Sequence, residues 1–222
     1  WIAYLGAALW VFVVVNAVNF MDGANGLMGG FMAVTSLGLA AFAFFADETS
    51  VAILAAGLAA SLCGFLPYNA RAKARIFCGD AGSLFTGFVF AAASLHLASR
   101  GHSPAALYAG PMLLLPFLVD VLLTLYIRLR RGENLLSPHK SHLYHLMIAA
   151  GRTHLQVSFS YVRNAVLMVM ATFAGGVTGF IGIAAYFIFW IFIISGLYAL
   201  RRNWFSRRLK RLAERRLDDA AP

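Results

Sequence analysis

The stretch Asn16–Leu27, with the sequence NAVNFMDGANGL, ends one long apolar segment and begins the next. The apolar segment before it, residues 1–20, is long enough to cross a lipid bilayer. The stretch itself carries carboxamides, the carboxylate of Asp22 and the glycines Gly23 and Gly26. Such residues at the mouth of a membrane span are costly unless they have a function. The stretch therefore predicts a membrane protein with a functional site at the end of this span.

The composition indicates an integral membrane protein built from helices. The chain is 61% hydrophobic and 12% charged, far from the balance of a soluble domain. Lipid-facing backbone must form its hydrogen bonds within its own segment, and no strand-like alternation appears. The predicted fold class is therefore all-α and polytopic. The chain does not begin with Met, and Trp1 lies inside an apolar run, so we expect a fragment whose upstream spans are missing.

Hydropathy predicts seven spans. The charge-free run 165–200 would reach ~54 Å as one helix, whereas the hydrocarbon core is ~30 Å thick. The glycines of 175–179 can form a turn that divides this run into two spans. The predicted spans are Trp1–Asn19, Leu27–Ala46, Val51–Leu66, Ala81–Ser99, Ala105–Ile127, Ser160–Ala174 and Phe180–Leu200.

The basic residues predict the topology of these spans. Every lysine and arginine except Arg100 falls on the side of Asp22, whereas an opposite turn carries Asp47 and Glu48. This pattern places the side of Asp22 in the cytoplasm, and it accounts for the net charge without a nucleic-acid partner. We expect one membrane domain, residues 1–200, and a basic cytoplasmic tail, residues 201–222. The tail is either an amphipathic helix on anionic headgroups or a plain topology anchor.

Three carboxylates are expected at the cytoplasmic face. Asp22 and Asp80 lie at span ends, and Asp120 lies about two turns inside the fifth span. Carboxylates that converge on one membrane face suit a hard cation and a phosphate, because Mg²⁺ binds one or two carboxylates together with substrate phosphates. The alternative is that each carboxylate caps a helix or pairs with an arginine.

Glycines and asparagines surround the first two carboxylates. Gly23 and Gly26 flank Asn25, and a similar pair, Gly79 and Gly82, brackets the second aspartate. Glycine lets backbone N–H groups at a helix start approach an anion closely. The expected helix also places Asn16 one turn before Asn19, with Asp22 one turn further on. For the asparagines, the alternative is hydrogen bonding between helices.

The segment Ser137–Gly151 predicts a short interfacial helix. Ser137 can cap its start, Pro138 suits the first turn, and Gly151 can end it. Histidines recur at every third position on one flank. They suit phosphates or a sugar nucleotide; a zinc site and histidines without a role are the alternatives. The polar residues concerned are His139, Lys140, His142 and His145.

In this order, the motifs resemble those of the polyprenyl-phosphate N-acetylhexosamine-1-phosphate transferases, glycosyltransferase family 4, over about residues 1–200. The resemblance implies that Asp80 is a Mg²⁺ ligand, with Mn²⁺ as the alternative, and that Asn19 lies beside the metal. It implies a place for Asp22 in the catalytic and nucleotide region. It further implies that His142 and His145 bind substrate phosphate or sugar.

Three features depart from the family pattern. Asn25 stands where relatives often have Asp, so we expect it to form hydrogen bonds without contacting the metal. The pattern His142-Leu-Tyr144-His145 resembles the branch that initiates O-antigen and enterobacterial common antigen more than the muramoyl-pentapeptide branch. The family's Asp-Asp motif lies upstream of the first motif here, so this polypeptide alone is expected to be inactive.

The resemblance implies transfer of an N-acetylhexosamine 1-phosphate from a UDP-sugar to undecaprenyl phosphate in a bacterial inner membrane, with release of UMP. This reaction would begin O-antigen or cell-envelope polysaccharide synthesis. The sequence leaves open whether the protein forms a homodimer. Alternatives are the phospho-N-acetylmuramoyl-pentapeptide transferase, a CDP-alcohol phosphotransferase, whose further motifs are missing, and a transporter. The expected substrate-binding residues are Asn16, Gly23, Asn25, Gly26, Asp120, Lys140, His142 and His145.

Overall fold

The computed structural model describes residues 1–222 except 101–103, 136, 138–139, 177–179 and 219–222. The described residues form eight helices, and none of these residues lies in a strand. Seven helices are long and apolar enough to cross a membrane, which confirms the predicted polytopic all-α architecture. The helices are α1 Ile2–Phe20, α2 Leu27–Phe45, α3 Thr49–Asn69, α4 Gly79–Arg100, α5 Ala105–Arg130, α6 Leu143–Ala149, α7 His154–Gly175 and α8 Phe180–Asp218.

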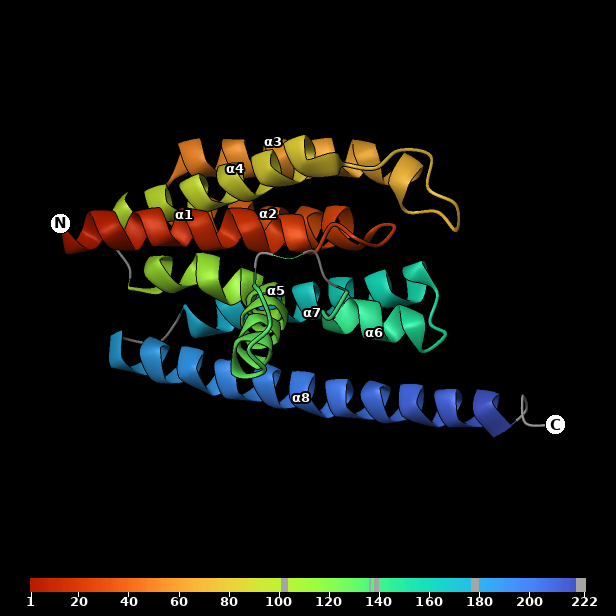
Figure 1. Ribbon diagram of the computed structural model, residues 1–222. Helices are drawn as coiled ribbons and strands as arrows, with labels where there is room; N and C mark the ends of the chain where they lie inside the picture. Colours follow the sequence, from red (N-terminus) through yellow and green to blue (C-terminus); the bar gives the residue numbers. More distant parts are fainter. Residues whose placement is uncertain (101–103, 136, 138–139, 177–179, 219–222) are drawn as a thin grey trace.

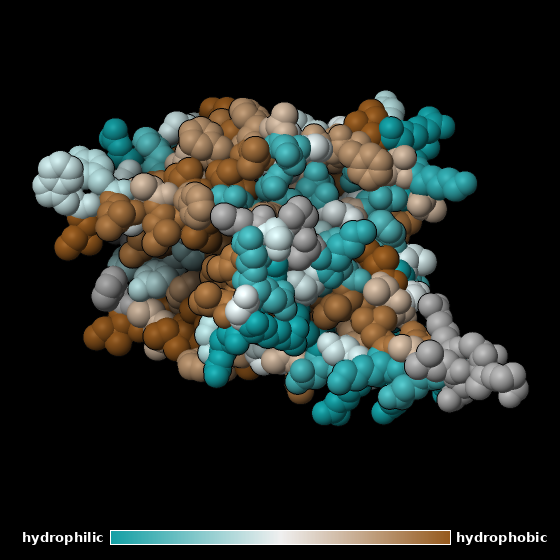
Figure 2. Space-filling view, in the orientation of Figure 1, coloured by the Kyte–Doolittle hydropathy of each residue, from teal (hydrophilic) through white to brown (hydrophobic). Residues whose placement is uncertain are grey.

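Polar connections gather at one end of the bundle (Figure 1). The turn 21–26, the loop 70–78 and α6 all lie at the end that also holds the C-terminal half of α8. Figure 2 shows hydrophobic side chains over most of the other end and many hydrophilic side chains at this one. The arrangement agrees with the predicted topology, in which these segments share one side of the membrane.

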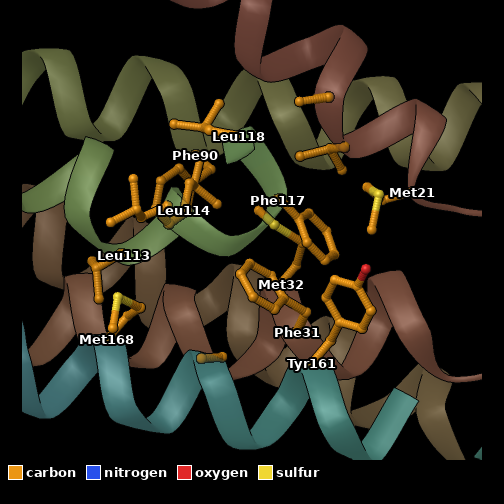
Figure 3. Close-up of a cluster of buried hydrophobic side chains, with 14 of the residues drawn as sticks. Met21, Phe31, Met32, Phe90, Leu113, Leu114, Phe117, Leu118, Tyr161 and Met168 are labelled. Atoms are coloured by element: carbon orange, nitrogen blue, oxygen red, sulfur yellow. The ribbon is translucent and has the colours of Figure 1, made fainter. Parts of the chain in front are cut away.

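Helix α2 lies at the centre of the bundle. Most of its side chains are buried, and Phe31 stacks on Phe117 of α5 with ring centroids 3.7 Å apart. Figure 3 shows these two rings beside Met32, with Tyr161 close by. A Cβ added at Gly38 would lie 2.5 Å from a methyl group of Val169, so glycine permits close approach of α7. Lipid is as apolar as these side chains, so the hydrophobic effect does not drive the helices together. Close van der Waals packing stabilises the bundle instead.

Helix α5 bends midway. Pro111 and Pro116 lie inside it, and each removes a backbone hydrogen-bond donor and crowds the preceding turn. Figure 1 shows the second half of α5 turning so that it is seen nearly end-on. Asp120 follows Pro116 by about one turn and is fully buried. The bend therefore brings an aspartate into the interior of the bundle.

The short helix α6 begins later than predicted. It starts at Leu143 instead of directly after Ser137, and Pro138 and His139 lie outside the described residues. The backbone N–H of Leu143 donates to Asp120 Oδ1 at 3.0 Å, so the helix start is fixed by a residue of α5. Its end is confirmed, because Gly151 follows the helix with a positive φ of 95°.

The last two spans are separate, as predicted, but α8 extends further. Helix α7 ends at Gly175, and α8 begins at Phe180. Helix α8 then continues through Arg201 to Asp218 without a break. The segment 201–216 is therefore helical, and it prolongs the last span in one rod (Figure 1).

Candidate active site

The end of α1 meets the start of α4 in a hydrogen-bonded contact. Asn19 Nδ2 donates to Asp80 Oδ1 at 3.1 Å and to Ser83 Oγ at 2.9 Å. Ser83 Oγ donates in turn to the carbonyl of Gly79 at 3.0 Å, which holds the first turn of α4. Asp80 is exposed, and no described residue hydrogen-bonds its Oδ2 or the carboxamide oxygen of Asn19. Both oxygens are available to a hard cation.

Asp22 lies beyond the end of α1, in the turn before α2, and not on the helix face of Asn16 and Asn19. Burial and then the negative charge of Asp80 raise the pKa of the Asp22 carboxyl to about 6. A hydrogen bond from the Gly79 backbone N–H opposes this rise. The two carboxylates are thus close enough to repel each other, and a cation between them would remove that repulsion.

A site with three carboxylate ligands does not form. The described residues contain no group of three or more His, Cys, Asp or Glu side chains placed to hold one metal ion. Asp22 and Asp80 lie together, whereas Asp120 is buried near the same end of the bundle, so the prediction that all three share one metal site is wrong. The donor set of Asp22, Asp80 and the Asn19 oxygen nevertheless fits Mg²⁺, which usually takes one or two carboxylates and completes its octahedron with water and phosphate oxygens.

Asp120 instead organises the histidine segment. Its Oδ2 accepts a hydrogen bond from the Tyr161 hydroxyl at 2.5 Å, and Thr124 Oγ1 donates to its Oδ1 at 3.3 Å. The same Oδ1 accepts from the Leu143 backbone and lies 3.5 Å from Nδ1 of His142. Because Asp120 is fully buried, it cannot bind substrate directly. It acts by fixing the start of α6 and the ring of His142.

Helix α6 is pinned against the turn that carries Asp22. The Tyr144 hydroxyl donates to the carbonyl of Phe20 at 3.2 Å and lies directly against Gly23. Burial, followed by the charges of Asp120 and Asp22, raises the pKa of Tyr144 well above its usual value, so the hydroxyl stays protonated. The histidine segment is therefore brought to the first motif, as the predicted site requires.

The two histidines differ in their exposure. His142 is buried at 2% exposure, and its ring lies 6.0 Å from that of Phe20. His145 is half-buried, and its ring lies 3.9 Å from the ring of Tyr144. His145 is thus the more accessible of the two rings, and Lys140 is also exposed.

Asn25 holds the basic loop in place. Its Nδ2 donates to the carbonyls of Arg71 at 2.8 Å and Ala72 at 3.3 Å. Its backbone N–H donates to His154 Nδ1 at 3.2 Å, and its carbonyl accepts from Ser158 Oγ at 2.6 Å. The side chain is buried, so Asn25 acts as a hydrogen-bonding residue that joins the first motif to the loop and to α7.

The two glycines of the first motif serve close packing. Gly26 has a φ of +76°, and a Cβ there would lie 2.9 Å from that of Ala70. The backbone N–H of Gly26 donates to Asn69 Oδ1 at 2.7 Å. The expectation that this N–H approaches an anion is therefore wrong. A Cβ at Gly23 would collide with the Tyr144 hydroxyl. Both glycines therefore let neighbouring segments approach.

Asn16 stands apart from this cluster. Its Nδ2 donates to the carbonyl of Phe12 within α1 at 2.7 Å, so Asn16 shows no hydrogen bond between helices. The alternative does apply to Asn19, which donates to Asp80 and Ser83 of α4. Asn16 instead lines an apolar groove of about 720 Å³ between α1 and α4, together with Phe85 and Phe88. The groove leads along the helices toward Asn19.

Sequence patterns missed several positioning residues. Tyr144 lies between the two histidines, and its hydrogen bond to a distant carbonyl leaves no local pattern. Asn69 ends α3 and donates to the carbonyl of Ile76 at 2.9 Å; a carboxamide just before a basic loop was the available signal. Tyr161 and His154 lie in α7 with no motif around them.

Comparison with known proteins gives consistent results. Residues 1–98 match the family described as Glycosyl transferase family 4. A decaprenyl-phosphate N-acetylglucosaminephosphotransferase of Mycobacterium leprae is 34% identical over 65% of this chain and 41% of its own length.

Two further relatives match over most of the chain. A probable undecaprenyl-phosphate N-acetylglucosaminyl 1-phosphate transferase of Bacillus subtilis is 28% identical over 97% of this chain and 62% of its own length. An undecaprenyl-phosphate alpha-N-acetylglucosaminyl 1-phosphate transferase of Escherichia coli K12 is 27% identical over 93% and 58%. The chain thus spans about half the length of these relatives. The motif order, the match of residues 1–98 and these similarities support a relationship to glycosyl transferase family 4.

Proposed function

We propose that the protein transfers an N-acetylhexosamine 1-phosphate from a UDP-sugar to a polyprenyl phosphate and releases UMP. The observation that carries the proposal is the contact of Asn19 with Asp80 beside Asp22, at the polar end of two membrane spans. The relatives' names, which contain undecaprenyl or decaprenyl phosphate and N-acetylglucosamine, support the acceptor and suggest the sugar. The proposed location is the cytoplasmic membrane of a bacterium.

The proposed reaction exchanges one phosphorus–oxygen bond for another. An oxygen of the lipid phosphate attacks the sugar-bearing phosphorus of the nucleotide sugar. The bond from that phosphorus to the bridging oxygen breaks, and the oxygen leaves on UMP. The product is a pyrophosphate-linked lipid sugar. Both reactants are anions, so the main requirement is to bring them together and neutralise their charge.

The chain's own residues fit this requirement. Asp80, Asp22 and Asn19 would hold Mg²⁺, which supplies neutralising charge for the phosphates when it is bound. His145 and Lys140 would donate hydrogen bonds to phosphate oxygens, and His142 would support this flank from its buried position. The loop with Arg71, which Asn25 holds in place, adds positive charge near the site.

Two surfaces support the access of the two substrates. The apolar groove between α1 and α4 passes Asn16 and suits a prenyl chain, whose phosphate would then lie near Asn19. The polar loops at the same end of the bundle suit a nucleotide from the aqueous side (Figure 1).

A transporter would instead need its polar residues near the middle of the membrane. Asp22 and Asp80 lie at helix ends, which favours the transferase.

The decisive experiment measures UMP release by the full-length enzyme with Asp80→Asn. We expect a loss of at least about 100-fold with unchanged thermal stability, because an exposed carboxylate that acts electrostatically is removed. Asp47→Asn is the matched control, since Asp47 is also at a helix end but in the turn between α2 and α3. Activity of Asp80→Asn within a few fold of wild type would contradict the proposal.

A further inference from the structure

A second groove, of about 620 Å³ and partly lined by arginines, lies between α7 and the second half of α8. It shares no residue with the Asn19–Asp80 contact or with the histidines of α6. Its walls combine arginines with aromatic and aliphatic side chains. The lining residues that carry the argument are Arg152, Phe159, Ser160, Arg163, Arg201 and Trp204.

Three positive charges meet in this groove. Arg201 is half-buried, and its Nη2 donates to Ser160 Oγ at 2.7 Å, so the guanidinium is held in place. The charges of Arg152 and Arg163 both act on Arg201. Among the described residues, no carboxylate lies within 4.0 Å of any of the three. Like charges gathered without a counter-charge favour the binding of an anion.

The rim of the groove is apolar and exposed. Phe159 is 71% exposed and Leu200 is 69% exposed. Trp204 is half-exposed, and Arg208 lies over its ring at 5.5 Å from the centroid. Tryptophan and arginine are typical of the membrane–water interface. In Figure 2, hydrophilic side chains gather over this polar half of α8. The groove thus combines arginines with a lipid-compatible rim at the polar end of the bundle.

We propose that this groove binds the phosphate of an anionic glycerophospholipid of the surrounding leaflet. The arginines would form paired, charge-assisted hydrogen bonds to the phosphate oxygens. Phe159, Leu200 and Trp204 would contact the glycerol and the first acyl carbons. The bound lipid would join α7 to α8 and stabilise the rod where it leaves the bundle. This site is independent of the proposed transfer reaction, because binding needs neither nucleotide nor divalent cation.

The test uses the full-length protein, purified in detergent and titrated with phosphatidylglycerol or phosphatidylcholine. Bound lipid is counted by native mass spectrometry. The double variant Arg152→Gln/Arg163→Gln removes two exposed groove charges, so it should fold. We expect it to bind phosphatidylglycerol at least about tenfold more weakly, since charge-assisted bonds to phosphate are lost. The matched control Arg207→Gln/Arg211→Gln removes equal charge from α8 outside the groove and should change binding less than about threefold.

Three outcomes would overturn the proposal. Equal losses in both double variants would show general attraction of lipid to a basic helix. Displacement of the lipid by millimolar inorganic phosphate would show a simple anion site. Displacement by polyprenyl phosphate at equal concentration would assign the groove to the acceptor substrate. None of these outcomes requires UMP release, so failure of the proposed function leaves this test intact.

Discussion

Asp80 and Asp120 are chemically identical carboxylates near the same end of the bundle, yet their surroundings differ completely. Asp80 is exposed, and the one hydrogen bond to its carboxylate in the described structure comes from Asn19. Asp120 is buried, and it accepts hydrogen bonds from Leu143, Tyr161 and Thr124. The carboxylate of Asp80 has an oxygen available to a ligand, whereas both carboxylate oxygens of Asp120 already accept hydrogen bonds.

In this bundle, binding and positioning are carried by carboxylates in different surroundings. A buried carboxylate is tolerated only when donors satisfy it, and removal of one partner then destabilises the fold. An exposed carboxylate contributes little to stability, so selection for function explains its presence at a membrane span better. Each of the following predictions tests one side of this comparison.

The largest effect is expected for Asp120→Asn. The new amide NH₂ would face either the donor of Leu143 or that of Tyr161, and the negative charge 3.5 Å from His142 Nδ1 would be lost. We expect a loss of about 3 kcal/mol in unfolding free energy, measured by denaturant titration of the full-length protein in detergent, and a parallel loss of UMP release. Tyr161→Phe removes a single donor and should cost about 1–2 kcal/mol.

An Asp120→Asn variant with wild-type stability but no activity would contradict the structural role given to Asp120. It would place Asp120 in direct contact with substrate instead of behind His142. A stable Asp120→Asn with full activity would remove its positioning role altogether.

The fold was largely predictable, because hydropathy and loop charge reveal spans without tertiary information. The seven spans follow from apolar length, and the division near Gly175 follows from that length together with the glycines of 175–179. The start of α6 did not follow, because its cap comes from Asp120, which is 23 residues earlier and reaches Leu143 only after the bend in α5. A local rule applied to Ser137 and Pro138 could not include that contact.

The site was predictable in part. The motifs identified Asp22, Asp80 and Asn19, and the structure brings them together. The sequence could not show that Asp120 points into the bundle. Its burial depends on the bend in α5, and the hydropathy of the preceding residues is the same for a straight helix and a bent one. Nor could the sequence show that the Gly26 N–H is already bonded to Asn69.

The second prediction concerns Asp22→Asn. This change removes the half-buried partner of Asp80, and we expect UMP release by the full-length enzyme to fall about 100-fold. Thermal stability at pH 8 without divalent cations should hold or rise, since a repulsive charge disappears. A large loss of stability, like that expected for Asp120→Asn, would show that Asp22, like Asp120, mainly stabilises the fold.

Asn25→Asp is expected to have a smaller, structural effect. The amide nitrogen of Asn25 donates to the carbonyls of Arg71 and Ala72. A carboxylate would face those carbonyls and repel them, so we expect a loss of about 1–3 kcal/mol in unfolding free energy. Asn25→Gln keeps the amide and tests size alone. An Asp variant as stable as wild type would mean that the loop can re-form around a charge.

The smallest effect is a pH dependence that Asp22 should impose on stability. Its pKa in the fold is about 6, above the ordinary 3.8, because of burial and then the charge of Asp80. The folded state therefore holds this proton more tightly than the unfolded state does. Without divalent cations, the contribution is present below pH 3.8 and is lost as the pH rises through 6.

Thermal melts of the cation-free full-length protein between pH 4 and pH 8 would measure this loss. Asp22→Asn should flatten that part of the profile, whereas Asp47→Asn should leave it unchanged, because Asp47 lies at the opposite helix ends. Millimolar Mg²⁺ should raise the melting temperature more at pH 8 than at pH 5, since the ionised pair attracts the cation more strongly. An Asp22→Asn profile identical to wild type would show that Asp22 does not carry the titration, and it would contradict the role given to this half-buried carboxylate.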